Sequence, residues 1–226
     1  MKRARRIIAH RGASGLAPEN TLNSIVRALQ LGVDGVEVDV RALRDGVPIV
    51  FHDASLRRIL RDDRMVCEVG LDEMKAMGRK LGLPIPTLRE VLRVINGKAM
   101  LVIEVKEWRA VDGVVEELRG TTTAMNVVIS SFDHRIPLHV KAEVDWVKVG
   151  FIVSLRPLSL SKLVDECVDV VFVRKDYVDE ELVREALELG LDLYAWVIND
   201  PVEAEEFWRL GVTGVVTDRP DLVKVK

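Results

Sequence analysis

Residues 36–53, VEVDVRALRDGVPIVFHD, decide how this chain is expected to fold. Two β-type runs, 36–40 and 47–51, stand in this stretch, and only seven residues separate Val40 from Pro48. A crossover between parallel strands needs about a dozen residues or more, so this connection is too short for one. Arg44-Asp45-Gly46 has the composition of a hairpin turn. We therefore predict that run 47–51 returns antiparallel to run 36–40.

Seven further runs rich in β-branched residues recur along the chain. Their apolar residues are continuous rather than alternating, which indicates strands that are covered on both faces, as in a parallel sheet. These runs span residues 6–9, 101–105, 127–130, 147–152, 170–173, 193–197 and 214–217. Together with run 36–40 they make eight parallel strands. The sequence therefore predicts an α/β fold, a (β/α)8 TIM barrel with a β-hairpin and a short excursion after the second strand, which continues through about Pro86.

Helix-type stretches lie between most of these runs. Thr87 and Asp200 each stand three residues before a glutamate, a pattern typical of helix starts. A glycine follows Leu31, Leu189 and Leu210 just before the next apolar run, as expected where a helix ends and a strand begins. No linker or low-complexity segment divides the chain, so residues 1–226 are predicted to form a single domain.

The composition argues against several classes of protein. The chain is 48% hydrophobic and 31% charged, which is too apolar for a disordered protein. Its net charge is −3, both signs are interspersed and aromatic residues make up 5%, so a nucleic-acid partner is not expected. No apolar run approaches the roughly 18 residues of a membrane span, and the apolar stretch 7–9 after the basic start is too short for a signal peptide. Two cysteines, Cys67 and Cys167, cannot make a disulfide framework. We expect a soluble, cytoplasmic protein.

Titratable residues fall at the carboxyl ends of the predicted strands, where barrel enzymes place their sites. His10 and Arg11 end the first strand, and the hairpin brings His52 back to the same rim. Glu37 and Asp39 are two residues apart on one strand, so their side chains face the same side. The pair Glu104 and Lys106 repeats this spacing on the next parallel strand.

Charge balance at this rim predicts a metal ion. Inward-facing carboxylates without compensation are costly, and one lysine cannot neutralise three of them. A divalent cation would supply the missing charge. Hard oxygen ligands of this kind favour Mg²⁺ or Ca²⁺ over zinc.

Each of these residues also has a structural interpretation. His10 alone is more often a strand-end histidine than a catalyst, and His52-Asp53 could cap a helix. Glu37 and Asp39 could cap helices or bridge to arginines, and Glu104 with Lys106 could form a structural ion pair. The other two histidines, His134 and His139, are predicted to lie in a helix away from the strand ends. Two histidines, three carboxylates, one arginine and one lysine nevertheless converge on one rim, and together they favour a site.

An ordered set of motifs resembles the glycerophosphodiester phosphodiesterase family and spans nearly the whole chain. The leading block, His10-Arg11-Gly12 followed by Pro18-Glu19-Asn20-Thr21, is the most specific part of the resemblance. The other motifs are Glu37-Val38-Asp39, residues 45–53, residues 84–91, Glu104-Val105-Lys106, Ser130-Ser131-Phe132, Trp196-Val197-Ile198-Asn199 and Thr217-Asp218-Arg219-Pro220.

The resemblance implies a role for each residue of the rim. It implies a barrel with a small inserted segment at about 53–83. It further implies that Glu37, Asp39 and Glu104 hold a divalent metal, that His10 and His52 are the acid/base pair, that Arg11 and Lys106 hold the phosphate, and that Trp196 lies beside the pocket. The sequence departs from the family pattern at 57–60, where Arg-Arg-Ile-Leu replaces the more usual Arg-Thr-Thr, and at 134–135, where His-Arg stands in place of a common Pro-Glu. The changed insert borders the alcohol site, so it leaves the substrate preference open.

The implied activity is metal-dependent hydrolysis of small glycerophosphodiesters to glycerol phosphate and an alcohol. One histidine would take a proton from the attacking hydroxyl and the other would give one to the leaving alkoxide, and the sequence does not say which does which. Two alternatives remain. A phosphodiesterase of the lysophospholipase D type would need an apolar ramp, which Leu56, Ile59 and Leu60 could begin although arginines interrupt them. A non-catalytic phosphate-binding barrel would be expected to lack a histidine or a ligand carboxylate, and all five are present.

Overall fold

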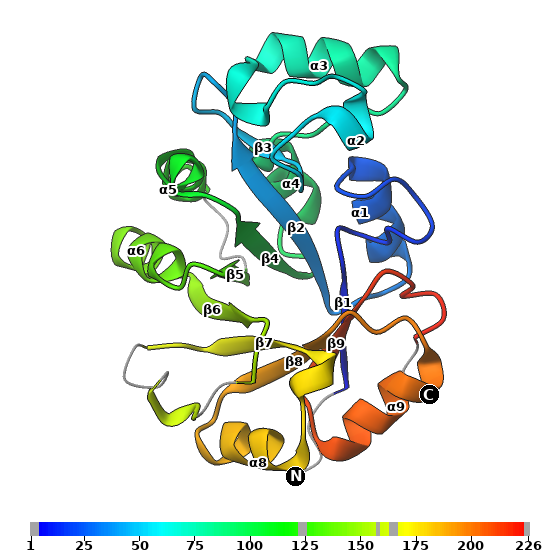
Figure 1. Cartoon of the computed structure of the whole chain (residues 1–226), viewed down its shortest axis with the longest axis vertical. Helices are drawn as coiled ribbons and strands as arrows, with labels where there is room; N and C mark the ends of the chain where they lie inside the picture. Colours follow the sequence, from blue (N-terminus) through cyan, green and yellow to red (C-terminus); the bar gives the residue numbers. More distant parts are fainter. Residues whose placement is uncertain (1–4, 122–125, 157–158, 163–166, 224–226) are drawn as a thin grey trace.

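Eight parallel strands form a closed barrel in the computed structural model, which describes residues 5–121, 126–156, 159–162 and 167–223 (Figure 1). β1 pairs with β2 on one side and with β9 on the other, so the ring closes. The barrel strands are β1 (Arg6–Ala9), β2 (Gly35–Ala42), β4 (Met100–Val105), β5 (Val127–Ser131), β6 (Lys148–Val153), β7 (Val170–Arg174), β8 (Asp192–Trp196) and β9 (Gly214–Thr217). The predicted TIM barrel is confirmed. The basic start at residues 1–4 lies outside the described residues.

The predicted hairpin is also confirmed. β3 (Pro48–Val50) pairs antiparallel with the end of β2, with Val40 opposite Val50. At the turn between them Gly46 has φ +79°, a left-handed conformation that favours glycine. β3 is shorter than the run 47–51, but the backbone N–H of Phe51 still donates to the carbonyl of Asp39 at 2.9 Å. The hairpin therefore keeps the following residue, His52, close to the inward-facing residues of β2.

Six of the described helices flank the barrel strands on the outside (Figure 1). They are α1 (Leu22–Gln30), α4 (Leu88–Ile95), α5 (Val111–Arg119), α6 (Arg135–Glu143), α8 (Glu180–Glu188) and α9 (Pro201–Leu210). The Thr87 hydroxyl caps α4 by accepting from the N–H of Glu90, and the Asp200 carboxylate caps α9 in the same way. Short 3₁₀ turns at Trp108–Ala110 and Lys175–Tyr177 follow β4 and β7. No helix in the described part of the chain is both long and apolar enough to cross a membrane.

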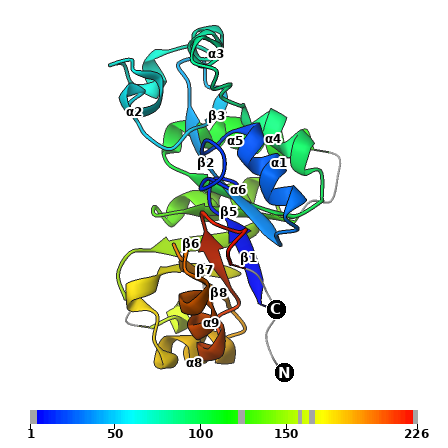
Figure 2. The same cartoon turned by 90° about the vertical axis from the view of Figure 1, so that its right-hand side faces the viewer.

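The excursion after β3 builds a small apolar cluster of its own. It contains α2 (Arg57–Leu60), the 3₁₀ turn Val66–Glu68 and α3 (Leu71–Lys80). Buried side chains from the excursion, among them Leu56, Leu60, Val66 and Met74, pack with Leu43 and Ile49 of the hairpin. In both views α2 and α3 lie at the opposite end of the molecule from α8 and α9 (Figures 1 and 2). The excursion ends where the carbonyl of Pro86 accepts from the N–H of Val50, as the sequence predicts.

The barrel interior is packed below the rim. Its buried side chains include Ile8, Met100, Val102, Val128, Val170, Phe172 and Tyr194. At the amino end of the strands the Tyr194 hydroxyl lies 3.2 Å from the Arg6 guanidinium, and burial raises the pKa of Tyr194 to about 12. Such a core leaves room for a ligand at the carboxyl ends of the strands.

Candidate active site

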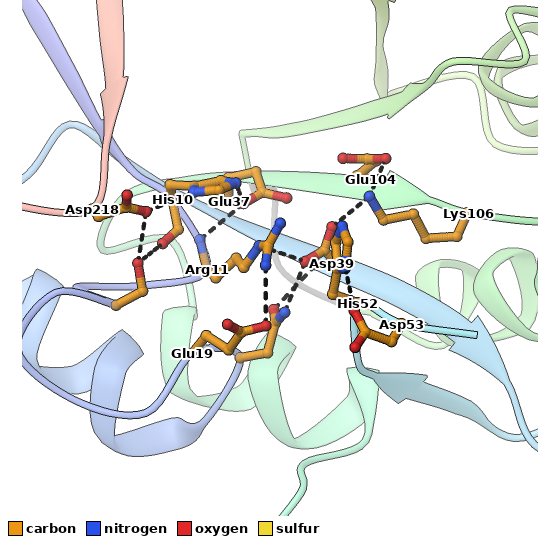
Figure 3. Close-up of polar contacts among 12 residues, drawn as sticks. His10, Arg11, Glu19, Glu37, Asp39, His52, Asp53, Glu104, Lys106 and Asp218 are labelled. Carbon is orange, nitrogen blue, oxygen red and sulfur yellow. Dashed lines mark hydrogen bonds and ion pairs between the residues drawn. The ribbon is translucent and has the colours of Figure 1, made fainter. Parts of the chain in front are cut away.

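A cavity of about 270 Å³ opens at the carboxyl ends of the barrel strands. Its polar residues are His10, Arg11, Glu37, His52, Glu104, Lys106 and Ser130, and its apolar residues are Val102, Phe132, Ile152, Phe172, Trp196, Val197 and Val216. Seven of the eight residues singled out by the sequence therefore lie on one cavity. The eighth, Asp39, is fully buried directly beside it and contacts both Arg11 and Lys106 (Figure 3).

Three carboxylates meet at the base of this cavity. Glu37 and Asp39 alternate along β2 and face the interior, and the register of the sheet places Glu104 of β4 directly opposite Asp39. One oxygen from each carboxylate lies within 4.8 Å of the others. Burial raises the pKa of Glu37 to about 8, assisted by the charge of Asp39, and burial also raises the pKa of Glu104.

The same carboxylates fit a divalent cation. Glu37 Oε2 accepts from the backbone N–H of Arg11 at 2.8 Å, but Glu37 Oε1 is buried and has no hydrogen-bond partner among the described residues. An orphaned carboxylate oxygen beside two other carboxylates is what a hard cation ligated by oxygen needs. The set of Glu37, Asp39 and Glu104 could therefore hold a divalent cation.

Two cations balance part of this negative charge. Lys106 Nζ lies 2.8 Å from Asp39 Oδ1 and also contacts Glu104, while Arg11 Nε lies 3.1 Å from Asp39 Oδ2. Burial raises the pKa of Asp39, but Lys106 and Arg11 outweigh it, so the pKa stays below its usual value. Asp39 is therefore ionised, and it holds the two cations in place. Lys106 and Glu104 do form the ion pair that the sequence allows as a structural alternative, and it lies inside the carboxylate cluster.

Asn20 anchors Asp39 from the loop before α1. Its amide donates to Asp39 Oδ2 at 2.8 Å, and its carbonyl oxygen accepts from the backbone N–H of Asp39 at 3.2 Å. The sequence offers Asn20 only as part of a motif and does not reveal this contact. Its left-handed backbone, at φ +57°, is a conformation that asparagine tolerates better than most residues.

Each of the two histidines is held by a carboxylate through Nδ1 (Figure 3). His10 Nδ1 lies 2.7 Å from Asp218 Oδ1, and His52 Nδ1 lies 2.7 Å from Asp53 Oδ1. Carboxylates accept hydrogen bonds, so both imidazoles carry a proton on Nδ1, and Nε2 is the nitrogen left for other partners. For His10, Nε2 faces the three carboxylates and lies 4.0 Å from Glu37 Oε2.

The anchors Asp218 and Asp53 are site residues that the sequence did not single out. Asp218 lies just after β9 and accepts further hydrogen bonds from Ser14 and Asn199, both at 2.9 Å. The motif containing Asp218 was recognised, but nothing in the sequence links it to His10. His52-Asp53 could have been a helix cap on sequence grounds, and it is instead an imidazole–carboxylate pair.

The prediction for His134 needs correction. It lies in the short connection between β5 and α6, and its ring stacks on Phe151 of β6 with centroids 4.0 Å apart. His134 Nε2 is 3.2 Å from the carbonyl of Ile152, so the ring lies beside the strands and not away from them. Neither His134 nor the exposed His139 is among the residues that line the cavity.

One wall of the cavity is apolar and aromatic. The rings of Trp196 and Phe132 contact each other edge to face, with centroids 6.1 Å apart, and Phe132 is 51% exposed at the mouth. Trp196 Nε1 is buried and has no hydrogen-bond partner among the described residues. The site thus combines a charged base with an apolar side, as expected for a ligand that carries both an anionic group and a carbon skeleton.

Replacing Asp218 with asparagine is expected to destabilise the protein in a pH-dependent way. Burial lowers the pKa of His10, but the hydrogen bond to Asp218 and the charge of Glu37 outweigh burial, so this pKa is raised. Burial raises the pKa of Asp218, but the hydrogen bond from His10 outweighs burial, so that pKa is lowered. The charged pair therefore stabilises the fold above the pKa of a free aspartate, about 3.9, and this contribution is lost as the pH rises through the raised pKa of His10.

Denaturant unfolding at two pH values measures this effect. At pH 5.5 we expect Asp218→Asn to lower the free energy of unfolding by about 1–2 kcal/mol. The loss should shrink as the pH is raised towards 9, because the imidazole progressively loses its charge as the pH passes through the pKa of His10. Equal losses at the two pH values would contradict a charged His10–Asp218 pair.

Comparisons with known proteins agree with this arrangement. A model of the glycerophosphoryl diester phosphodiesterase family matches residues 10–222. A glycerophosphodiester phosphodiesterase of Caldanaerobacter subterraneus subsp. tengcongensis is 32% identical over 231 residues, which cover 95% of this chain and 94% of that protein.

Solved structures give the same result. A phosphodiesterase of Oleispira antarctica in complex with the product sn-glycerol-3-phosphate superposes with a TM-score of 0.89 at 30% identity, covering 97% of this chain and 95% of that one. A glycerophosphodiester phosphodiesterase of Thermotoga maritima superposes with a TM-score of 0.83 at 27% identity and covers 96% of both chains.

Proposed function

Because this chain belongs to the glycerophosphoryl diester phosphodiesterase family, we propose that it hydrolyses glycerophosphodiesters to glycerol phosphate and an alcohol with the help of a divalent cation and two histidines. The observation that carries the proposal is the meeting of two carboxylate-held imidazoles, three buried carboxylates and two cations around one cavity. The product named for the Oleispira antarctica complex, sn-glycerol-3-phosphate, supports glycerol phosphate as the product here.

The proposed roles follow from the charge that the reaction creates. A phosphodiester carries one negative charge, and more charge develops on its oxygens during hydrolysis. Arg11 and Lys106 line the cavity and are the groups that would stabilise this charge. A divalent cation held by Glu37, Asp39 and Glu104 would supply electrophilic stabilisation of the same oxygens.

The two histidines suit proton transfer. With an ordinary pKa near neutrality, an imidazole can accept a proton from the attacking hydroxyl or give one to the leaving alkoxide. His10 and His52 lie on the same cavity, and because a carboxylate holds Nδ1 of each, Nε2 would carry the transferred proton in both. Trp196 would form part of the wall against which the carbon skeleton of the substrate packs.

Two further features complete the proposal. The segment at about 53–83 is an insertion within one domain rather than a separate unit, because its apolar cluster includes Leu43 and Ile49 of the hairpin. The free cysteines Cys67 and Cys167 support a reducing, cytoplasmic environment.

Turnover with and without metal tests the proposed function. The purified protein is incubated with glycerophosphocholine or glycerophosphoethanolamine, with Mg²⁺, Ca²⁺ or excess chelator, and release of glycerol phosphate is followed. We expect turnover with a metal, a loss of at least about 100-fold in chelator, and recovery on adding back the ion, since such a cation supplies several kcal/mol of stabilisation to the transition state.

Other outcomes assign the chain differently. Turnover that survives the chelator unchanged would contradict the metal site. Cleavage of lysophosphatidylcholine without cleavage of any glycerophosphodiester would favour the lysophospholipase D type. Binding of glycerol phosphate without turnover of either substrate would identify a non-catalytic barrel.

A further inference from the structure

The guanidinium of Arg58, on α2 in the excursion, lies between two carboxylates at the edge of the site. Its Nε donates to Asp53 Oδ2 at 2.6 Å and its Nη2 to Asp53 Oδ1 at 3.0 Å. Its Nη1 donates to Glu19 Oε2 at 3.0 Å and its Nη2 to Glu19 Oε1 at 2.7 Å. One planar side chain therefore binds two carboxylates with two hydrogen bonds each, a geometry that only arginine can supply.

Each of these carboxylates also holds a residue of the cavity. Asp53 accepts from Nδ1 of His52 at 2.7 Å, and Glu19 accepts from Nη1 of Arg11 at 3.0 Å. Arg11 in turn contacts Asp39 at 3.1 Å. Arg58 thus completes a continuous series of polar contacts that runs from His52 through the excursion to Arg11 and the carboxylate cluster.

The position of α2 is set by apolar packing within the excursion. Leu56, just before the helix, and Leu60, at its end, are buried in the cluster that the excursion shares with the hairpin. The neighbouring Arg57 points elsewhere, since its side chain is 77% exposed and pairs with the exposed Asp63. The same short helix therefore carries one arginine that reaches the site and one that does not.

We propose that Arg58 is a positioning residue through which the excursion holds His52 and Arg11 in place for the reaction, an inference that rests on the proposed function of these two residues. The ion pairs of Arg58 are partly exposed, with 47% of its side chain accessible, so their contribution to global stability is small. Their effect is on geometry. Without Arg58, Asp53 would be free to leave the His52 ring, and Glu19 would keep Arg11 as its only cationic partner among those contacts.

Substitution of Arg58 separates this role from a general effect on folding. We expect Arg58→Gln to lower kcat/KM by about 10- to 100-fold, the size of effect that misplacing a reacting group produces. Loss of the contact with Asp53 should lower kcat because His52 is then held less firmly. Loss of the contact with Glu19 should raise KM because Arg11 is then held less firmly. Asp53→Asn should reproduce mainly the fall in kcat, and Glu19→Gln mainly the rise in KM. Arg58→Lys should restore only part of the activity, because a single ammonium cannot bind both carboxylates in two-bond geometry.

Arg57→Gln is the matched control, and it should leave kcat/KM within about twofold of the wild type because surface changes of this kind have small effects. The melting temperatures of the two arginine variants should be similar. Added to the Asp53→Asn/Glu19→Gln double variant, Arg58→Gln should cost less than about threefold more, as expected when residues act through one another. Retention of kcat/KM within threefold in Arg58→Gln, or full additivity with that double variant, would overturn the proposal.

A readout that does not depend on turnover distinguishes this inference from the proposed function. The ¹⁵N signals of the His52 ring report its hydrogen bonding directly, and they should move or broaden in Arg58→Gln but not in Arg57→Gln. If the wild-type protein cleaves no glycerophosphodiester, the proposed function fails, and a changed His52 signal in Arg58→Gln still supports positioning by Arg58. An unchanged signal in that variant would overturn it.

Discussion

Alanine at His10 or at His52 is expected to lower kcat by about 10²- to 10⁴-fold, the usual contribution of a positioned acid or base. Each imidazole lies on the cavity with Nδ1 held by its own carboxylate, so each loss removes a proton carrier that no other described residue of the cavity replaces. KM should change much less than kcat, because the charged groups that would bind the phosphate, Arg11 and Lys106, stay in place. Steady-state kinetics with glycerophosphocholine measures both constants.

The control for these variants is His139→Ala. His139 is exposed on α6 and contacts the Trp108 ring, away from the cavity. It should retain the activity of the wild type. The double variant His10→Ala/His52→Ala should be little worse than either single variant, since groups that act as a unit show strongly non-additive effects. Activity that persists in both single variants would contradict the acid/base assignment.

Removal of the Asp39 carboxylate should abolish activity and also destabilise the fold. Asp39 is the buried counter-charge shared by Lys106 and Arg11, so Asp39→Ala leaves these two largely buried cations with only Glu104 and Glu19 as carboxylate partners. Breaking a buried ion pair from one side typically costs about 3–5 kcal/mol. We expect a loss of free energy of unfolding of this size, together with loss of turnover. Denaturant unfolding in excess chelator isolates the stability effect from any metal.

Glu37→Gln provides the matched comparison on the same strand. Burial raises the pKa of Glu37, which means that its ionised form destabilises the metal-free fold at pH 7.5. The neutral variant should therefore be at least as stable as the wild type in chelator, although it too should lose turnover. If Glu37→Gln were destabilised as strongly as Asp39→Ala under these conditions, the assignment of Asp39, and not Glu37, as the carboxylate that stabilises Lys106 and Arg11 would be wrong.

The barrel could be predicted because its rules are local. The connection between Val40 and Pro48 is too short for a crossover, and this fact alone separates the antiparallel β3 from eight parallel strands. Alternation along β2 likewise predicts that Glu37 and Asp39 face one side. Their convergence with Glu104 follows once the two strands are neighbours, because register places Asp39 opposite Glu104.

The supporting contacts could not be predicted, because they depend on distant parts of the chain. Asp218 lies 208 residues after His10, and only the pairing of β1 with β9 brings the two together. Arg58 sits on a helix of four residues, too short for any periodicity, and its partner Glu19 lies in another loop. His134 was placed wrongly because α6 begins only at Arg135, so His134 stays in the connection from β5 and its ring lies against Phe151 of β6.

The closure of the ring between β1 and β9 also affects how the protein comes to be active as it is synthesised. β1 leaves the ribosome first and β9 last, so during most of translation His10 has no carboxylate at Nδ1. The pair forms only when the final strand docks and the edges of the unfinished sheet meet. A chain that ends before β9 also lacks Asp218, and therefore lacks the carboxylate that holds Nδ1 of His10. We therefore expect the chain to become active only when the barrel is complete, so that activity reports closure of the ring between β1 and β9.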